Sequence, residues 1–109
     1  MQESALPKDI DAVAVAVQDL VDAEFAKAGS VVPGSALDQL GLRDCLQIVR
    51  QYLEHGETGV ALDHVLYVIR ELDLTIPADT YVALARAAQA VKGGQAMVEG
   101  VKVTAPSAG

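Results

Sequence analysis

The stretch 42-LRDCLQIVRQYLEHGETGVALDHVLYVIREL-72 decides the fold of this chain. From residue 42 to residue 54, apolar side chains recur at helical spacing and mark one face of an α-helix. Residues 58–72 repeat this spacing and are more apolar all round, as is typical of a central helix. Between them, the pentapeptide HGETG (55–59) holds two glycines, which punctuate helices. The stretch therefore predicts an antiparallel pair of helices whose second member is the central helix of the fold.

A further helix is predicted on each side of this pair. Residues 7–29 carry apolar side chains at helical spacing, with Pro7 in the first turn and a glycine at the end. The last helix starts at Pro77 and stops near residue 92. It has Asp79 in its first turn, where the helix dipole favours an acid. Four helices joined by short links predict an all-α fold, a four-helix bundle of antiparallel helices.

The chain of 109 residues has the length of one domain. We expect residues 1–92 to form a single helical domain, with a short extra turn near residues 35–40, where SALDQLG opens on a serine. Residues 93–109 are Gly-rich, and we expect a flexible C-terminal tail there. The alternative is that MVEGVKV (97–103) forms a short strand.

The composition narrows the classes of function. Hydrophobic residues make up 51% of the chain but aromatic residues only 4%, so Ala, Val and Leu must form most of the core, which favours helices over a sheet. The formal net charge of −7 argues against direct nucleic-acid binding, because phosphate groups require a clustered positive surface. The same charge suits a basic protein partner.

Other patterns point to a cytoplasmic protein. Cys45 is the only cysteine, so no intramolecular disulfide can form. Residues 1–10 lack a basic region followed by an apolar one, so we expect no secretory signal. No apolar run approaches the roughly 18 residues of a membrane-spanning helix, so we expect no membrane partner.

The polar residues do not form a pattern typical of an enzyme or a metal site. His55, His64 and Cys45 are too few for a structural zinc site, and Cys45 falls on an apolar stripe, where a thiol is usually inert. No serine has the context of a nucleophile elbow, and no Gly-rich loop precedes a helix that carries a lysine. We therefore expect no enzymatic activity, no metal and no cofactor. We expect His64 to be a half-buried packing residue.

Negative charge is concentrated in one part of the chain. Between residues 36 and 80 there are eight acidic and three basic residues, so most of the net charge of −7 falls in under half of the sequence. Each acid alone is best explained as solvated surface. Together, around the turn at 55–59, the acids form a candidate docking site for a basic partner.

The central stretch EHGETGVALDHVLYVIRELDLTIPADTYVALARA (54–87) resembles the Maf-type family of immunity proteins, which protect bacteria from their own polymorphic toxins. It is also similar in character to the small helical immunity proteins of contact-dependent growth inhibition systems. The resemblance covers about residues 42–92. The matching residues are Gly56, Glu57, Gly59, Ala61, Leu62, Asp63, Glu71, Asp73, Ile76 and Tyr81. Pro77 stands where the family has a serine-type helix cap, which leaves the subfamily and the toxin open.

The resemblance implies an immunity protein that binds and neutralises a cognate toxin domain, with a nuclease as the expected class, by masking its basic active-site region. The expected partner-binding residues are Glu54, Glu57, Asp63, Tyr67, Arg70 and Glu71. The acids would pair with Lys and Arg of the toxin, Tyr67 would be an aromatic anchor, and Arg70 would make a bidentate contact.

Two other functions stay open at this point. The chain could be a helical adaptor or a self-associating interaction domain, such as a homodimer, without a toxin partner. An acyl-carrier-like protein would carry its modification on Ser35, but GSALDQLG (34–41) lacks the Asp-Ser-Leu context of that family.

Overall fold

The computed structural model describes residues 6–30, 33–35, 41–91 and 94–104, with main chain alone at residues 94 and 95. Within these ranges the chain forms four main helices, one short helix and two short strands. The elements are α1 (Leu6–Ala28), α2 (Cys45–Glu54), α3 (Thr58–Glu71), β1 (Thr75–Ile76), α4 (Ala78–Gln89), α5 (Gly94–Met97) and β2 (Lys102–Val103). The predicted all-α fold with four helices is confirmed. The extra turn expected near residues 35–40 falls mostly on residues 36–40, which lie outside the described ranges.

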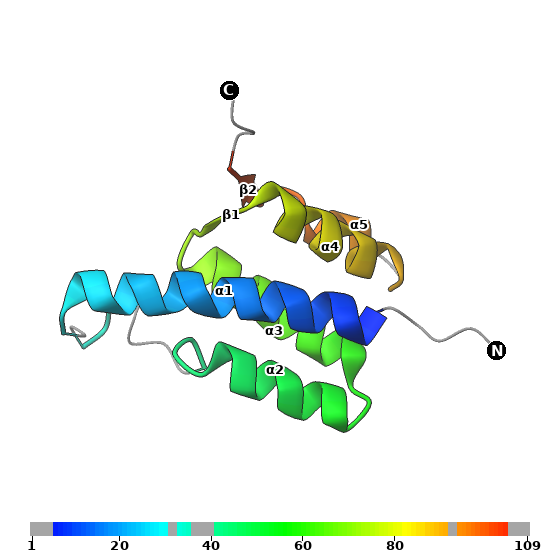
Figure 1. Ribbon diagram of the computed structural model, residues 1–109, viewed down its shortest axis with the longest axis horizontal. Helices are drawn as coiled ribbons and strands as arrows, with labels where there is room; N and C mark the ends of the chain where they lie inside the picture. Colours follow the sequence, from blue (N-terminus) through cyan, green and yellow to red (C-terminus); the bar gives the residue numbers. More distant parts are fainter. Residues whose placement is uncertain (1–5, 31–32, 36–40, 92–93, 105–109) are drawn as a thin grey trace.

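Helix α1 is the centre of the arrangement. Figure 1 shows α4 and α5 on one side of α1, α2 on the other, and α3 behind it. Contacts join α3 to α1 and α2, so α3 has the two neighbours expected of its broad apolar face, but α1 contacts α2, α3 and α4 and is the more central helix. The physical reason is length: α1 has 23 residues and buries apolar side chains along most of them, from Ile10 to Val21. It therefore has room for neighbours on several sides.

The core consists of the apolar stripes that the sequence shows. Helix α3 buries six side chains and α2 contributes Cys45 and Val49. The buried side chains of α3 are Ala61, Leu62, Val65, Leu66, Val68 and Ile69. Complete burial of a Leu or Ile side chain contributes about 1.5–3 kcal/mol, so α3 is held mainly by its apolar face.

The turn between α2 and α3 is a Schellman motif. The N–H of Glu57 donates to the carbonyl of Tyr52 at 2.9 Å, and the N–H of Gly56 donates to that of Leu53 at 3.1 Å. Gly56 has a φ of +74°, a conformation that costs little only for a residue without Cβ. Gly59 lies inside α3 with an ordinary negative φ. The two glycines of HGETG thus have different roles, and Gly56 alone ends α2.

Residues 94–104 form α5 and β2 and pack against the rest of the fold. Strand β2 pairs in parallel with β1, in the register Thr75↔Lys102 and Ile76↔Val103. The N–H of Thr104 continues the ladder by donating to the carbonyl of Ile76 at 2.8 Å. Val98 is buried. The predicted flexible tail is therefore wrong for residues 94–104, because the backbone after α3 offers hydrogen-bonding partners and the core offers an apolar contact. The alternative of a short strand is confirmed at residues 102–103.

Candidate functional site

Three of the acids predicted to bind a partner lie near the α2–α3 turn, and the fourth, Glu71, lies at the far end of α3. Glu54 is the last residue of α2, Glu57 lies in the turn, and Asp63 and Glu71 lie on α3. All four side chains are exposed. We call the three acids near the turn, Glu54, Glu57 and Asp63, the acidic hairpin surface. None of them forms an ion pair with a Lys, Arg or His residue among those the structure describes.

The basic residues explain why these acids stay unpaired. Four of the described bases form ion pairs with acids outside the acidic hairpin surface. These pairs are Lys27–Glu24, Arg50–Asp11, Arg86–Asp9 and Lys102–Asp73. Arg43 lies over the ring of Phe25, with 4.7 Å from its guanidinium carbon to the ring centroid. Most of the described basic residues therefore serve internal contacts, and none of those pairs compensates the negative charge around the turn.

Arg70 also makes an internal contact. Its Nη2 donates a hydrogen bond to the carbonyl oxygen of Met97, the last residue of α5. This contact ties α5 to α3 and gives the side chain a structural role that the sequence did not predict. A guanidinium has five N–H donors, so the bidentate partner contact expected of Arg70 would have to use those that Met97 leaves.

The six predicted partner-binding residues fall into two groups. Asp63, Tyr67, Arg70 and Glu71 follow one another at spacings that place them on one strip of α3. Glu54 instead lines a hollow of about 420 Å³ on α2, together with Leu46, Gln47, Arg50 and Gln51. Glu57, in the turn, separates the two groups along the chain. A partner that contacts all six residues must therefore reach over the end of the helical pair.

Three rings connect α2 to the strip on α3. The ring centroids of Tyr52 and His64 are 6.4 Å apart, and those of His64 and Tyr67 are 5.7 Å apart. His64 Nε2 lies 3.0 Å from the carbonyl oxygen of Gly41 and donates to it, because a carbonyl can only accept. All three side chains are half-buried, so the prediction that His64 is a half-buried packing residue is confirmed. The sequence does not predict this contact between rings, because Tyr52 follows the apolar spacing of its own helix.

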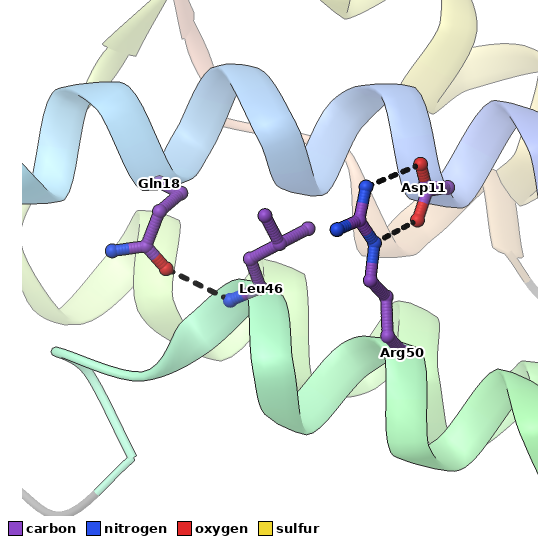
Figure 2. A network of polar contacts seen from close by, with 4 residues as sticks. All are labelled: Asp11, Gln18, Leu46 and Arg50. Carbon is purple, nitrogen blue, oxygen red and sulfur yellow. Dashed lines mark hydrogen bonds and ion pairs between the residues drawn. The ribbon is translucent and has the colours of Figure 1, made fainter.

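Polar contacts between α1 and α2 fix the position of the helical pair (Figure 2). Gln18 Oε1 accepts the backbone N–H of Leu46 at 2.9 Å, and Gln18 Nε2 donates to the carbonyl of Arg43 at 2.9 Å. Further along, Arg50 Nε and Nη2 donate to the two carboxylate oxygens of Asp11, at 2.7 and 3.2 Å. Neither contact is predictable from a local pattern, since the partners lie at least 25 residues apart.

The thiol and the second histidine lie in ordinary surroundings. Burial raises the pKa of the Cys45 thiol to about 12, so the group stays protonated and unreactive at neutral pH. His55 is exposed, with Nδ1 at 2.8 Å from the carbonyl oxygen of Gln51 in its own helix. Among the described residues, no three His, Cys, Asp or Glu side chains are placed to hold a metal ion together.

No helix within the described ranges combines the length and apolar character needed to cross a membrane. No protein-family model, curated protein or solved structure matches the chain.

Proposed function

We propose that this chain is a non-catalytic binding protein whose acidic hairpin surface docks on a basic protein, and that this partner is a bacterial toxin domain that it neutralises. The observation that carries the proposal is the set of three exposed, unpaired acids around the α2–α3 turn, Glu54, Glu57 and Asp63. The arginines among the described residues all make internal contacts, and these acids pair with none of them. The end of the helical pair at the turn is therefore negatively charged.

Such a surface acts mainly on the encounter between two proteins. Exposed charges of opposite sign raise the association rate and select against partners of the wrong charge, and salt weakens both effects. The half-buried Tyr67 beside the acids supplies an aromatic side chain, the residue type that often contributes most to the affinity of an interface. Acids at the rim with an aromatic residue among them suit a basic surface on the partner.

The identity of the partner as a toxin domain rests on the resemblance of residues 42–92 to immunity proteins. A nuclease domain is the favoured class, because an enzyme that binds nucleic acid is positively charged around its active site. Masking that region with an acidic surface would block substrate access without any chemistry by the inhibitor. The cytoplasm is the compartment in which such an inhibitor would protect its own cell.

Co-purification with the product of the adjacent reading frame tests this function. The gene of an immunity protein directly neighbours that of its toxin, so the two products should purify as a complex and the chain should restore growth to cells that express the toxin. A toxin domain that kills equally well in the presence of this chain would overturn the toxin assignment. Self-association of the chain with no such complex would support an adaptor domain instead.

A further inference from the structure

A groove of about 280 Å³ lies between α1 and α4, on elements that the acidic hairpin surface does not use. Three alanines line it, Ala12 and Ala16 from α1 and Ala83 from α4. Alanine side chains at these positions leave the space that a larger residue would fill. Val15, which also lines the groove, is 39% exposed, and Val82, next to Ala83 on α4, is 55% exposed. The groove thus has an apolar lining along most of its length, with Val15 open to solvent.

The two ends of the groove differ in charge. At one end stand Asp19 of α1 and Asp79 of α4, both exposed. Neither forms an ion pair within the described part of the chain, although Asp79 accepts the N–H of Thr80 at 2.9 Å. One helical turn beyond Ala12 and Ala83, Arg86 pairs with Asp9 through two hydrogen bonds of 2.9 Å and neutralises it. The groove is therefore negative at the Asp19–Asp79 end only.

We propose that this groove is a second docking surface, and that its occupant is a basic amphipathic helix of a partner protein. An apolar side chain of that helix would lie over the three alanines. A Lys or Arg one turn along would reach Asp19 and Asp79, since side chains three or four positions apart share a helix face. The volume is at the lower limit of small-molecule sites, which suits one or two inserted side chains rather than a cofactor.

Charge also argues against a second copy of this chain as the occupant. Two copies of a chain with a net charge of −7 repel each other, and a second copy would bring no excess of basic side chains to Asp19 and Asp79. A basic segment removes that repulsion and adds two ion pairs. The groove proposal stands independently of the acidic hairpin surface, because the two surfaces share no residue.

A titration with synthetic helical peptides, followed by backbone amide chemical shifts of the full chain, tests the proposal. The probe is a peptide with leucines at every fourth position and lysines one turn away. Its counterpart has glutamate in place of each lysine. The lysine peptide should shift the amides of Ala12, Val15, Ala16 and Ala83 in a saturable manner, and the glutamate peptide should not. Asp19→Asn together with Asp79→Asn should weaken binding about fivefold, the contribution of two exposed ion pairs.

Two further variants make each outcome decisive. Ala12→Gln places a larger helix-forming side chain in the groove at an exposed position. This variant should stay folded but no longer bind the lysine peptide. Glu57→Gln with Asp63→Asn, on the acidic hairpin surface, should leave binding at the groove unchanged. The proposal is overturned if the shifts map only to the α2–α3 turn, if both peptides bind equally, if neither binds, or if folded Ala12→Gln binds as the unmodified chain does.

Discussion

Gln18 of α1 caps the N-terminus of α2: its Oε1 accepts the backbone N–H of Leu46 at 2.9 Å across 28 positions of sequence. The residue at the N-cap position of α2, Asp44, makes no side-chain cap of its own. The first N–H groups of a helix have no partner within the helix, so a side chain from elsewhere must take this role. Through this contact, α1 fixes the helix that carries Glu54.

We expect Gln18→Ala to destabilise the chain by about 1 kcal/mol, the usual cost of losing a side-chain cap. Urea unfolding followed by circular dichroism measures this change. Gln18→Glu is the matched control, because it keeps an oxygen acceptor for Leu46 but loses the donor to the Arg43 carbonyl. The stability of this variant should lie between that of the unmodified chain and that of the alanine variant. Equal stability of all three proteins would show that the cap contributes nothing.

The two glycines of the HGETG turn should respond oppositely to alanine. Gly56→Ala forces a Cβ into a φ of +74° and should cost about 1 kcal/mol. Gly59→Ala meets no atom within 4 Å and adds a better helix former to α3, so it should stabilise the chain by about 0.5 kcal/mol. Thermal unfolding of the two variants measures both effects. The assignment of Gly56 as the helix stop fails if both substitutions are equally tolerated.

Local signals in the sequence were sufficient to predict where the helices lie. Apolar spacing predicted α2 and α3 within a few residues, and Gly56 marked the turn between them because its conformation depends on neighbouring residues alone. The exposed acids of the acidic hairpin surface were also predictable, since charged residues opposite an apolar stripe face solvent. These features depend on short stretches of chain.

Contacts between distant segments were not predictable from the sequence. The pairing of Thr75 with Lys102 depends on how α4 and α5 return the chain to the end of α3. Capping by Gln18 and the contact of Arg70 with the Met97 carbonyl join residues more than 20 positions apart. The groove between α1 and α4 was missed for the same reason, because its lining comes from both helices. No periodicity within one helix shows which residues of another it will face.

The ion pair between Asp9 and Arg86 should make stability depend on pH in acid. A hydrogen bond from Arg86, helped by its charge and opposed by burial, lowers the pKa of the Asp9 carboxyl below its usual value. Because the pKa is lower in the folded state than in the unfolded state, the ionised carboxylate stabilises the fold above about pH 4, and this contribution disappears as the pH falls through the folded value. Asp9→Asn should therefore lower the melting temperature at pH 7, with a difference that shrinks towards pH 2.

Asp11→Asn is the matched control for this pH dependence. Asp11 also pairs with an arginine through two hydrogen bonds, but its side chain is 36% exposed, against 12% for Asp9. Exposed ion pairs contribute little to stability, so this variant should melt close to the unmodified chain. A larger effect for Asp11→Asn than for Asp9→Asn would contradict the role given to burial.

Cys45 should be inert in the folded chain. The thiol lies at the first residue of α2, where a helix N-terminus would lower its pKa, but burial dominates and raises the pKa to about 12. We expect a thiol reagent at neutral pH to label the folded chain only as fast as the chain unfolds, and to label it at once in concentrated urea. Mass spectrometry over time measures the rate. Immediate labelling without denaturant would contradict the burial of this side chain.

The most direct measurement of the proposed function is the salt dependence of partner binding with the acidic hairpin surface reversed in charge. Glu54, Glu57 and Asp63 are replaced together by Lys, and a control triple replaces the exposed acids Asp22, Asp44 and Glu99 by Lys. Calorimetric titration with the co-purified basic partner should show at least about a tenfold loss of affinity and a flatter salt dependence for the hairpin triple, with a clearly smaller change for the control. Unchanged affinity and salt dependence in a folded hairpin triple would contradict binding through this surface.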